Sequence, residues 1–345
     1  MRKDPFRLHR LALAPFLDSD QHVDFTSLLT KAEEEGINNF LQFLIFNGLA
    51  PLWHEALANA GQENIIDPVF LEKLRQVHLT AEANYLMQKK TLQKVHGELT
   101  LAGIKYVVFK GALIREQVYE NPALRPCTDI DVLVAKQDRD AAIQALKNVG
   151  MDYKPDAKNI SHEATLIDGP VHIDLHWQIL RPGRMRVDMT ESILKDARIN
   201  NGFVGLRDEA SIFVMLVHPA FTKHVCNPYA SLIRIIDLMR WIQFRSVNWE
   251  DIFGLCEKAG VKTAAWATIY WMNLLIRDET LVLFLKRLAP NTFQRKYLEF
   301  WINNNLPSRF VNKNNFVRIF FSLAIQDSFS DSLKTLKIYY KIERI

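Results

Sequence analysis

Two aspartates one residue apart, Asp129 and Asp131, lie in the stretch "DIDVLV", which otherwise has the character of a buried β-strand. Successive side chains of a strand point to opposite faces, so the two carboxylates share one face, and Ile130, Val132 and Val134 share the other. Two anions this close repel each other and raise each other's pKa, so a functional pair needs a cation between them. Hard oxygen ligands with a phosphate nearby suit Mg²⁺.

The D-x-D pattern by itself is weak evidence, because it occurs twice more in the chain. It recurs at Asp18 and Asp20 and at Asp138 and Asp140, in neither case within a strand. We interpret the first pair as part of a solvated loop and the second as the start of a helix. The neighbouring segments must therefore decide whether Asp129 and Asp131 have a chemical role.

The segment upstream predicts a nucleotide-binding turn made of Lys110, Gly111, Ala112 and Arg125. In "KYVVFKG" a strand leads into Lys110-Gly111, and a helix is expected to begin near Ala112. Unpaired amides at a helix N-terminus bind anions. Glycine at position 111 lets a phosphate approach the backbone, and Lys110 or Arg125 could neutralise its charge. An ordinary turn between a strand and a helix accounts for the same residues.

The segment downstream, "ATLIDGPVHIDLHW", predicts two strands joined by a tight turn at residues 168–170. Alternation along the second strand gives one apolar face and one polar face, the latter carrying His172, Asp174 and His176. A third carboxylate thus joins the candidate site. Two alternatives stay open: a solvated sheet face, and a zinc or iron site built on these three residues, because imidazole favours such metals.

Taken together, these segments resemble a known family. A strand, a glycine turn into a helix, a D-x-D strand and a third aspartate on a later strand resemble the nucleotidyltransferase fold of the DNA polymerase β superfamily. More closely, "KGALIREQVYENPALRPCTDIDVLV" and "HIDLHW" are similar to a bacterial nucleotidyltransferase-like family often encoded near peptide-modification or polysaccharide genes. The similarity covers roughly residues 20–260, with support from "HPAFTKH", "LIRIIDLMRWI" and the helix of Trp249.

The resemblance implies roles for particular residues. Asp129 and Asp131 would bind the metal ions that bridge the nucleotide phosphates, and Asp174 would complete the site and help to activate the attacking hydroxyl. Gly111 would lie under the triphosphate. Where the superfamily usually has serine or a second glycine this chain has Ala112, and its glycine is further from the first aspartate than in minimal members.

The resemblance also implies an activity: Mg²⁺-dependent transfer of a nucleoside monophosphate from a nucleoside triphosphate to an unidentified acceptor. Mn²⁺ could replace Mg²⁺, ATP is the expected nucleotide, and the acceptor is a peptide, a sugar or a small molecule. Two alternatives remain. One is a catalytically silent nucleotide-binding or scaffold protein with the same fold, and the other is a metal-dependent hydrolase that uses His172, Asp174 and His176.

The surrounding pattern predicts an α+β fold, in which helical regions flank a small mixed sheet. Helical spacing with glycine stops fills residues 1–98, short β-branched and aromatic runs alternate with helices over 99–190, and helical spacing returns over 205–345. We therefore predict an N-terminal helical region, a nucleotidyltransferase core and a C-terminal helical domain. Polar or proline-bearing stretches at 151–160 and 181–208 are the expected linkers.

The C-terminal helical region offers four further candidates on the acceptor side of the site: His218, Lys223, His224 and Asp237. Each has an ordinary structural interpretation too, because a single histidine or aspartate beside an apolar helix is commonly a satisfied structural residue. Two arginines of the same segment, Arg234 and Arg240, are interpreted as solvated or paired charges.

Bulk composition limits the partners and the compartment. A net charge of +4 over 345 residues is too mild for a nucleic-acid-binding surface. The three cysteines are far apart in the sequence and form no CxxC motif, so neither a disulfide framework nor a thiolate zinc site is indicated. This favours a reducing cytoplasm. The basic start has a short apolar part with a proline, so we expect no cleavable signal, and no apolar run reaches the roughly 20 residues that span a bilayer.

The C-terminal tail, "NFVRIFFSLAIQDSFSDSLKTLKIYYKIERI", mixes aromatic residues with Lys334, Lys337, Lys341 and Arg344. This pattern is compatible with an amphipathic helix that makes weak contact with a membrane surface. It is also compatible with a terminal helix that packs on the domain and keeps its basic side in water.

Overall fold

The computed structural model describes residues 4–17, 23–155, 162–200, 202–226, 232–310 and 315–342. Asp18 and Asp20, the first of the additional D-x-D pairs, lie outside these residues, as do Arg344 and the side chain of Lys341 in the tail.

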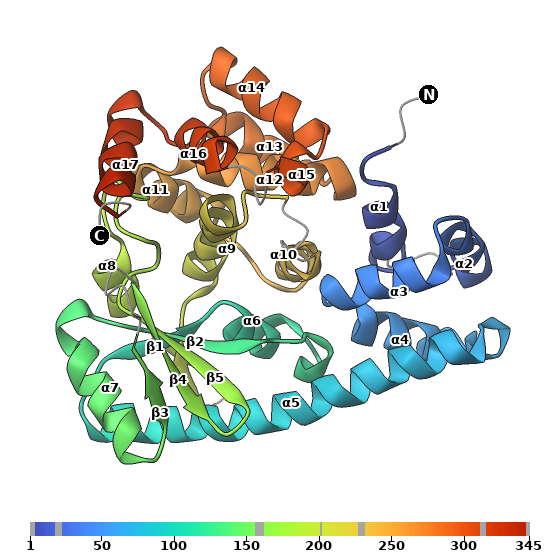
Figure 1. The fold of residues 1–345 in the computed structure, drawn as a ribbon, viewed down its shortest axis with the longest axis horizontal. Helices are drawn as coiled ribbons and strands as arrows, with labels where there is room; N and C mark the ends of the chain where they lie inside the picture. Colours follow the sequence, from blue (N-terminus) through green and yellow to red (C-terminus); the bar gives the residue numbers. More distant parts are fainter. Residues whose placement is uncertain are drawn as a thin grey trace.

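In residues 4–17 and 23–101 the N-terminal region has five helices: α1 (Arg7–Leu13), α2 (Phe25–Glu34), α3 (Ile37–Phe46), α4 (Ala50–Asn59) and α5 (Pro68–Leu101). Short 3₁₀ turns accompany them, namely η1 (Ala14–Phe16) and η2 (Glu63–Ile65). Gly36 and Gly48, the predicted stops, have φ of 88° and 71°, a region that favours glycine. Asp67 caps α5 by accepting a hydrogen bond from the Phe70 amide. The 34 residues of α5 run the length of the molecule beneath the sheet in Figure 1.

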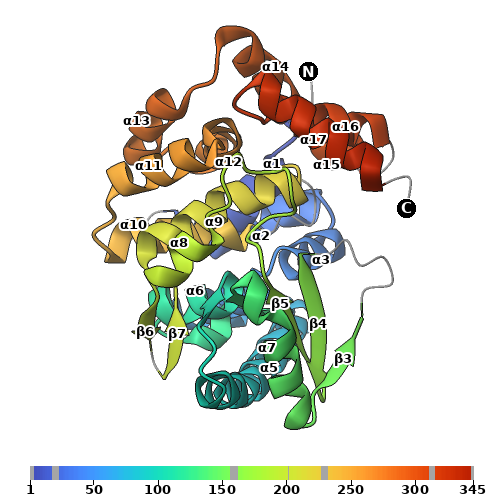
Figure 2. The same cartoon turned by 90° about the vertical axis from the view of Figure 1, so that its left-hand side faces the viewer.

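A seven-stranded mixed sheet forms the centre: β1 (Tyr106–Phe109), β2 (Asp129–Val134), β3 (Asp152–Lys154), β4 (Glu163–Asp168), β5 (Val171–His176), β6 (Arg198–Asn200) and β7 (Phe203–Gly205). Its order is β3-β4-β5-β2-β1-β7-β6. Strand β2 pairs antiparallel with β1 and parallel with β5, and a turn at Gly169 joins β4 to β5 as predicted. Figure 2 shows β3 and the β6–β7 hairpin at opposite edges.

Three of these strands fall in stretches that we predicted as linkers. Strand β3 lies within residues 151–160, and β6 and β7 lie within residues 181–208. Each has three residues, and their letters "DYK", "RIN" and "FVG" carry too few alternating apolar residues to register as strands. β3 and β6 form the two edges of the sheet and β7 lies next to β6, and each forms because a neighbouring strand supplies backbone hydrogen-bonding partners.

Helices connect the strands of the sheet along the chain: α6 (Gly111–Val118), η3 (Pro122–Leu124), η4 (Lys136–Asp138), α7 (Arg139–Asn148) and α8 (Thr190–Lys195). Asp138 is the N-cap residue of α7, and Asp140 lies in its first turn. The prediction that this second D-x-D pair marks the start of a helix is therefore confirmed.

Nine helices follow the sheet in the described part of the chain: α9 (Asp208–Thr222), α10 (Ile233–Phe244), α11 (Trp249–Ala259), α12 (Lys262–Ile276), α13 (Glu279–Leu288), α14 (Thr292–Asn303), α15 (Leu306–Phe310), α16 (Asn315–Ala324) and α17 (Phe329–Ile342). The predicted cap of α11 is confirmed, since Asn248 accepts from the amides of Glu250 and Asp251, and Gly260 ends the helix in a left-handed conformation.

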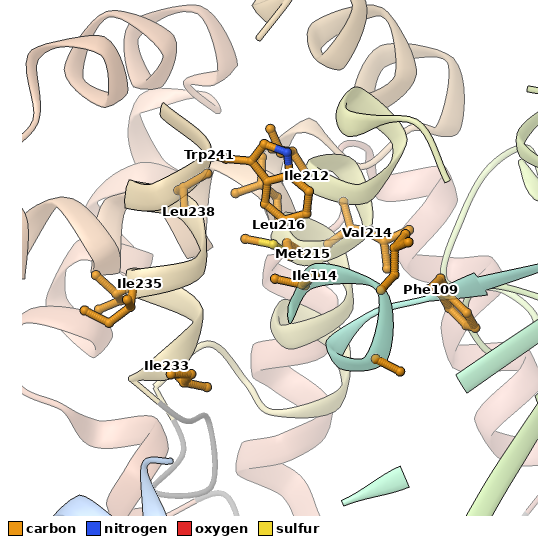
Figure 3. Packing of buried hydrophobic residues seen from close by; sticks show 14 of the residues in the cluster. Phe109, Ile114, Ile212, Val214, Met215, Leu216, Ile233, Ile235, Leu238 and Trp241 are labelled. Carbon is orange, nitrogen blue, oxygen red and sulfur yellow. The ribbon is translucent and has the colours of Figure 1, made fainter. Parts of the chain in front are cut away.

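The architecture is the predicted α+β fold, a mixed sheet enclosed by helices (Figure 1). Buried apolar residues from all three predicted regions belong to one continuous cluster. Figure 3 shows the part of it in which Ile114 of α6, Val214 and Met215 of α9, and Leu238 and Trp241 of α10 lie close together. The division into three domains stays a prediction.

The tail packs on the rest of the protein through its buried side. Phe321 and Ile325 are fully buried, and Asp331 accepts a hydrogen bond from Arg186 at 2.7 Å. The opposite side exposes Phe316 and Phe320. None of the helices in the described residues is long and apolar enough to cross a bilayer. Contact with a membrane surface stays a prediction.

Candidate active site

The pairing of β2 with β5 brings the predicted carboxylates together. Asp131 lies directly opposite Asp174 in the parallel register, and Asp129 is two residues earlier on the same face of β2. Oxygens of Asp131 and Asp174 and a ring nitrogen of His176 all lie within 4.8 Å of one another. The Thr165 hydroxyl donates to Asp174 Oδ1 at 2.9 Å and so orients this carboxylate.

Lys110 contacts this group directly. It precedes α6 with φ of 54° and ψ of −140°, a conformation that costs a non-glycine residue roughly 1–3 kcal/mol. The sharp bend lets Lys110 Nζ donate to Asp131 Oδ1 at 2.6 Å, and the same oxygen lies 2.8 Å from His176 Nε2. The lysine that we expected to neutralise a phosphate is thus paired with a carboxylate in this structure.

The two aspartates of β2 have opposite pKa shifts. Burial raises the pKa of Asp129 to about 6, and the neighbouring Asp131 and Asp174 add to this effect. Burial also acts to raise the pKa of Asp131, but Lys110 and His176 outweigh it and lower this pKa to about 2. Asp129 is therefore the carboxylate that most needs a further cation.

This difference predicts that the stability of the metal-free protein depends on pH. The ordinary pKa of Asp129 is 3.8, so between that value and about 6 the folded chain retains a proton that the unfolded chain has lost. Stability then falls as pH rises through this window, by up to about 3 kcal/mol. We expect Asp129→Asn to be more stable than the wild type in urea titrations with a chelator at pH about 7, and to show little advantage at pH about 4. If Asp129→Asn were stabilised equally at both pH values, the pKa of Asp129 would not be raised in the folded protein.

We predicted that Gly111 and Arg125 would each contact a phosphate, and in the structure the two residues lie against each other. A Cβ atom at Gly111 would lie 2.3 Å from Arg125 Nη1 and 2.4 Å from Cys127 Sγ, so the glycine makes room for these two side chains. Arg125 is buried and donates through Nη2 to Asp237 Oδ2 at 2.8 Å. Its charge is thus already paired, which corrects the expectation that it is available to neutralise a phosphate.

The carboxylates open into a cavity of about 990 Å³ between the sheet, α5, α9 and α10. Of the predicted residues, those that line it are Lys110, Gly111, Arg125, Asp129, Asp131, Asp174, His218, Lys223 and His224. Four others do not line it: Ala112 and Asp237 are fully buried, His176 is buried behind Asp131, and His172 is exposed. Asp237, expected on the acceptor side, instead holds Arg125 and accepts from the Tyr119 hydroxyl at 2.7 Å.

Sequence reasoning missed the most unusual cation of the cavity, Arg234. It lines the cavity, and its Nη1 is buried with no hydrogen-bond partner among the described residues. Burial, with the charge of Arg125, lowers its pKa to about 10. We had interpreted Arg234 as solvated or paired, whereas in the structure it is only partly exposed and its Nη1 has no partner among the described residues. Its place between the buried Ile233 and Ile235 on α10 was the available signal for this burial.

The wall of the cavity is rich in cations. Besides Arg125, the basic residues that line it are Lys110, Arg181, Arg184, Lys223, Arg234 and Arg318. Arg318 comes from α16, so the C-terminal tail contributes to the site. Acidic groups on the sheet, together with basic groups from helices and loops around the cavity, suit a ligand that carries both phosphates and a divalent cation.

The mixed sheet, the D-x-D strand with a third aspartate in register, and the helix that begins beside them define the α+β nucleotidyltransferase fold. A family described as uncharacterised nucleotidyltransferases matches residues 33–277. The chain belongs to this family. No curated protein matches it.

Proposed function

We propose that the protein is a Mg²⁺-dependent nucleotidyltransferase, which moves a nucleoside monophosphate from a nucleoside triphosphate to an acceptor. The observation that carries this proposal is the convergence of Asp129, Asp131 and Asp174 in one cavity with a row of basic side chains. ATP is the expected nucleotide, with a peptide, a sugar or a small molecule as acceptor. The mild net charge of +4 makes nucleic acid an unlikely acceptor, and the free cysteines suit a cytoplasmic location.

The three carboxylates fit Mg²⁺, because they are hard oxygen donors, and burial together with their mutual repulsion raises the pKa of Asp129. Asp129, Asp131 and Asp174 would hold the ion, which neutralises phosphate charge and orients the reacting oxygens. Asp174, which accepts a hydrogen bond from Thr165, would accept the proton of the acceptor hydroxyl. Lys110 donates to Asp131 Oδ1, and a metal ion bound to that carboxylate would leave the ammonium group for the phosphates.

Arg234 would bind the nucleotide phosphates from the helical side of the cavity. We expect Arg234→Met to weaken binding of a nucleoside triphosphate with Mg²⁺ by about 10- to 100-fold, because a hydrogen bond to a charged group contributes roughly 1.5–3 kcal/mol. Arg240→Met is the matched control, since Arg240 lies on the same helix with its guanidinium over the Tyr119 ring at 4.4 Å. Calorimetry on both variants measures the effect, and equal affinities would remove Arg234 from the site.

The activity is tested with each labelled nucleoside triphosphate in turn, with Mg²⁺ and candidate acceptors. We expect pyrophosphate release and labelled product with one nucleotide above the others. Transfer that persists in a chelator would contradict the proposal.

A second candidate function is nucleotide binding without transfer. The contact between Lys110 and Asp131 favours it, because an ammonium group occupies an oxygen that a metal ion needs. In that case nucleotide would bind without pyrophosphate release. The hydrolase built on His172, Asp174 and His176 is not proposed, because His172 is exposed and belongs to neither metal-competent group found in the described residues.

A further inference from the structure

A second group of potential metal ligands lies next to the carboxylates. It consists of His162, Glu163 and His176, and one ligand atom from each lies within 4.8 Å of the others. The β4–β5 pairing creates it, because Glu163 lies opposite His176 in register and the Trp177 amide donates to the His162 carbonyl at 3.0 Å. His162 and His176 are both buried, whereas Glu163 is only partly buried.

The two ring nitrogens of His176 have different surroundings. Nε2 lies 2.8 Å from Asp131 Oδ1, an acceptor, so this nitrogen carries a proton. Nδ1 is buried and makes no hydrogen bond in the described structure, although it lies 3.2 Å from Glu163 Oε2. An imidazole that donates to a carboxylate from one nitrogen and offers the other to an ion is the usual arrangement of a metal-binding histidine.

Two of the three separations between the ligand atoms suit a tetrahedral ion, and the third, between the two histidine nitrogens, is within 4.8 Å. Glu163 Oε2 lies 3.2 Å from His176 Nδ1 and 3.5 Å from His162 Nε2. Ligands about 2.0–2.1 Å from a tetrahedral zinc ion are about 3.3–3.5 Å apart.

We propose that His162, Glu163 and His176 bind a zinc-class transition-metal ion, separate from the Mg²⁺ site. His162 and Glu163 line the cavity, so a fourth ligand can come from its solvent. Lys110 and Arg181 also face this region and oppose a cation, while Glu163 and Asp131 offset them. Through His176 the ion positions Asp131, so the three ligands are positioning residues. This inference does not depend on the proposed transfer reaction.

The test measures metal content in the full chain. We expect purified wild-type protein, loaded with Zn²⁺ and dialysed, to retain about one equivalent by mass spectrometry, and His162→Gln and Glu163→Gln to lose at least about 10-fold in Zn²⁺ affinity. His172→Gln is the matched control, because this exposed histidine lies on the same strand as His176 and retains the ion. The proposal would be overturned if the wild-type protein held no zinc, or if the control lost as much Zn²⁺ affinity as His162→Gln.

Three further measurements keep the result independent of folding defects and of the transfer reaction. Wild-type protein loaded with Co²⁺ should show the visible absorption of a tetrahedral site with nitrogen and oxygen ligands, and its absence would count against the site. Asp129→Asn should retain zinc even though it loses transfer. Asp174→Asn should also retain zinc, and a loss there would place the ion in the Asp131, Asp174 and His176 group instead.

Discussion

Asp129→Asn and Asp131→Asn are each expected to lose nucleotide transfer by about a thousandfold or more, while the fold is retained. In the proposed function each carboxylate would contribute charge that neutralises the metal ion and holds it against the phosphates, and the loss of about 4 kcal/mol of transition-state stabilisation corresponds to this factor. Asparagine has the same shape, so the packing of β2 between β1 and β5 is preserved. Pyrophosphate release at saturating Mg²⁺ and nucleotide measures the loss.

The chain contains its own control for this experiment. Asp138 and Asp140 repeat the D-x-D pattern at the start of α7, and Asp140 is exposed. Asp140→Asn should therefore leave transfer unchanged. If Asp131→Asn also left it unchanged, the carboxylates of β2 would have no part in the reaction.

Asp237→Ala is expected to destabilise the protein by about 3–5 kcal/mol, because it leaves a buried guanidinium without its partner. Asp237 is fully buried and accepts from Arg125 Nη2 at 2.8 Å and from the Tyr119 hydroxyl at 2.7 Å. The effect should appear as a lower midpoint in urea unfolding. A substrate-binding aspartate would instead change the KM with little change in stability.

The double variant Arg125→Met with Asp237→Leu separates the two causes of this loss of stability, which are an unpaired buried charge and lost packing. Replacing both charges with apolar residues removes the unpaired buried cation, so most of the stability should return. A double variant as unstable as Asp237→Ala would show that lost packing, and not an unpaired charge, is responsible.

The chemistry-bearing strands could be predicted from the sequence because their signals are local. Alternation in "DIDVLV" and "HIDLHW" placed Asp129, Asp131 and Asp174 on polar faces, and the β2–β5 register joins those faces. The glycine turn after β1 and the capped helix at Asn248 follow the same local rules. Short edge strands were missed because three residues carry no recognisable period.

The partners of the charged residues could not be predicted, because they come from distant parts of the chain. Arg125 and Asp237 are 112 residues apart, and Lys110 and Asp131 are 21 apart, so only the folded sheet and the packing of α10 on α6 bring each pair together. The apolar neighbours Ile233 and Ile235 signal that Arg234 is partly buried. They do not signal which charges the fold places beside it.

The proposed function requires a metal ion, held by three aspartates, that makes nucleotide binding possible. Titration calorimetry with a non-hydrolysable nucleoside triphosphate tests this claim most directly, on wild-type protein and on Asp129→Asn, with Mg²⁺ and with a chelator. We expect tight binding only by the wild type and only with Mg²⁺. Binding of equal strength in the chelator or in Asp129→Asn, or no binding of any nucleotide under any condition, would contradict the account.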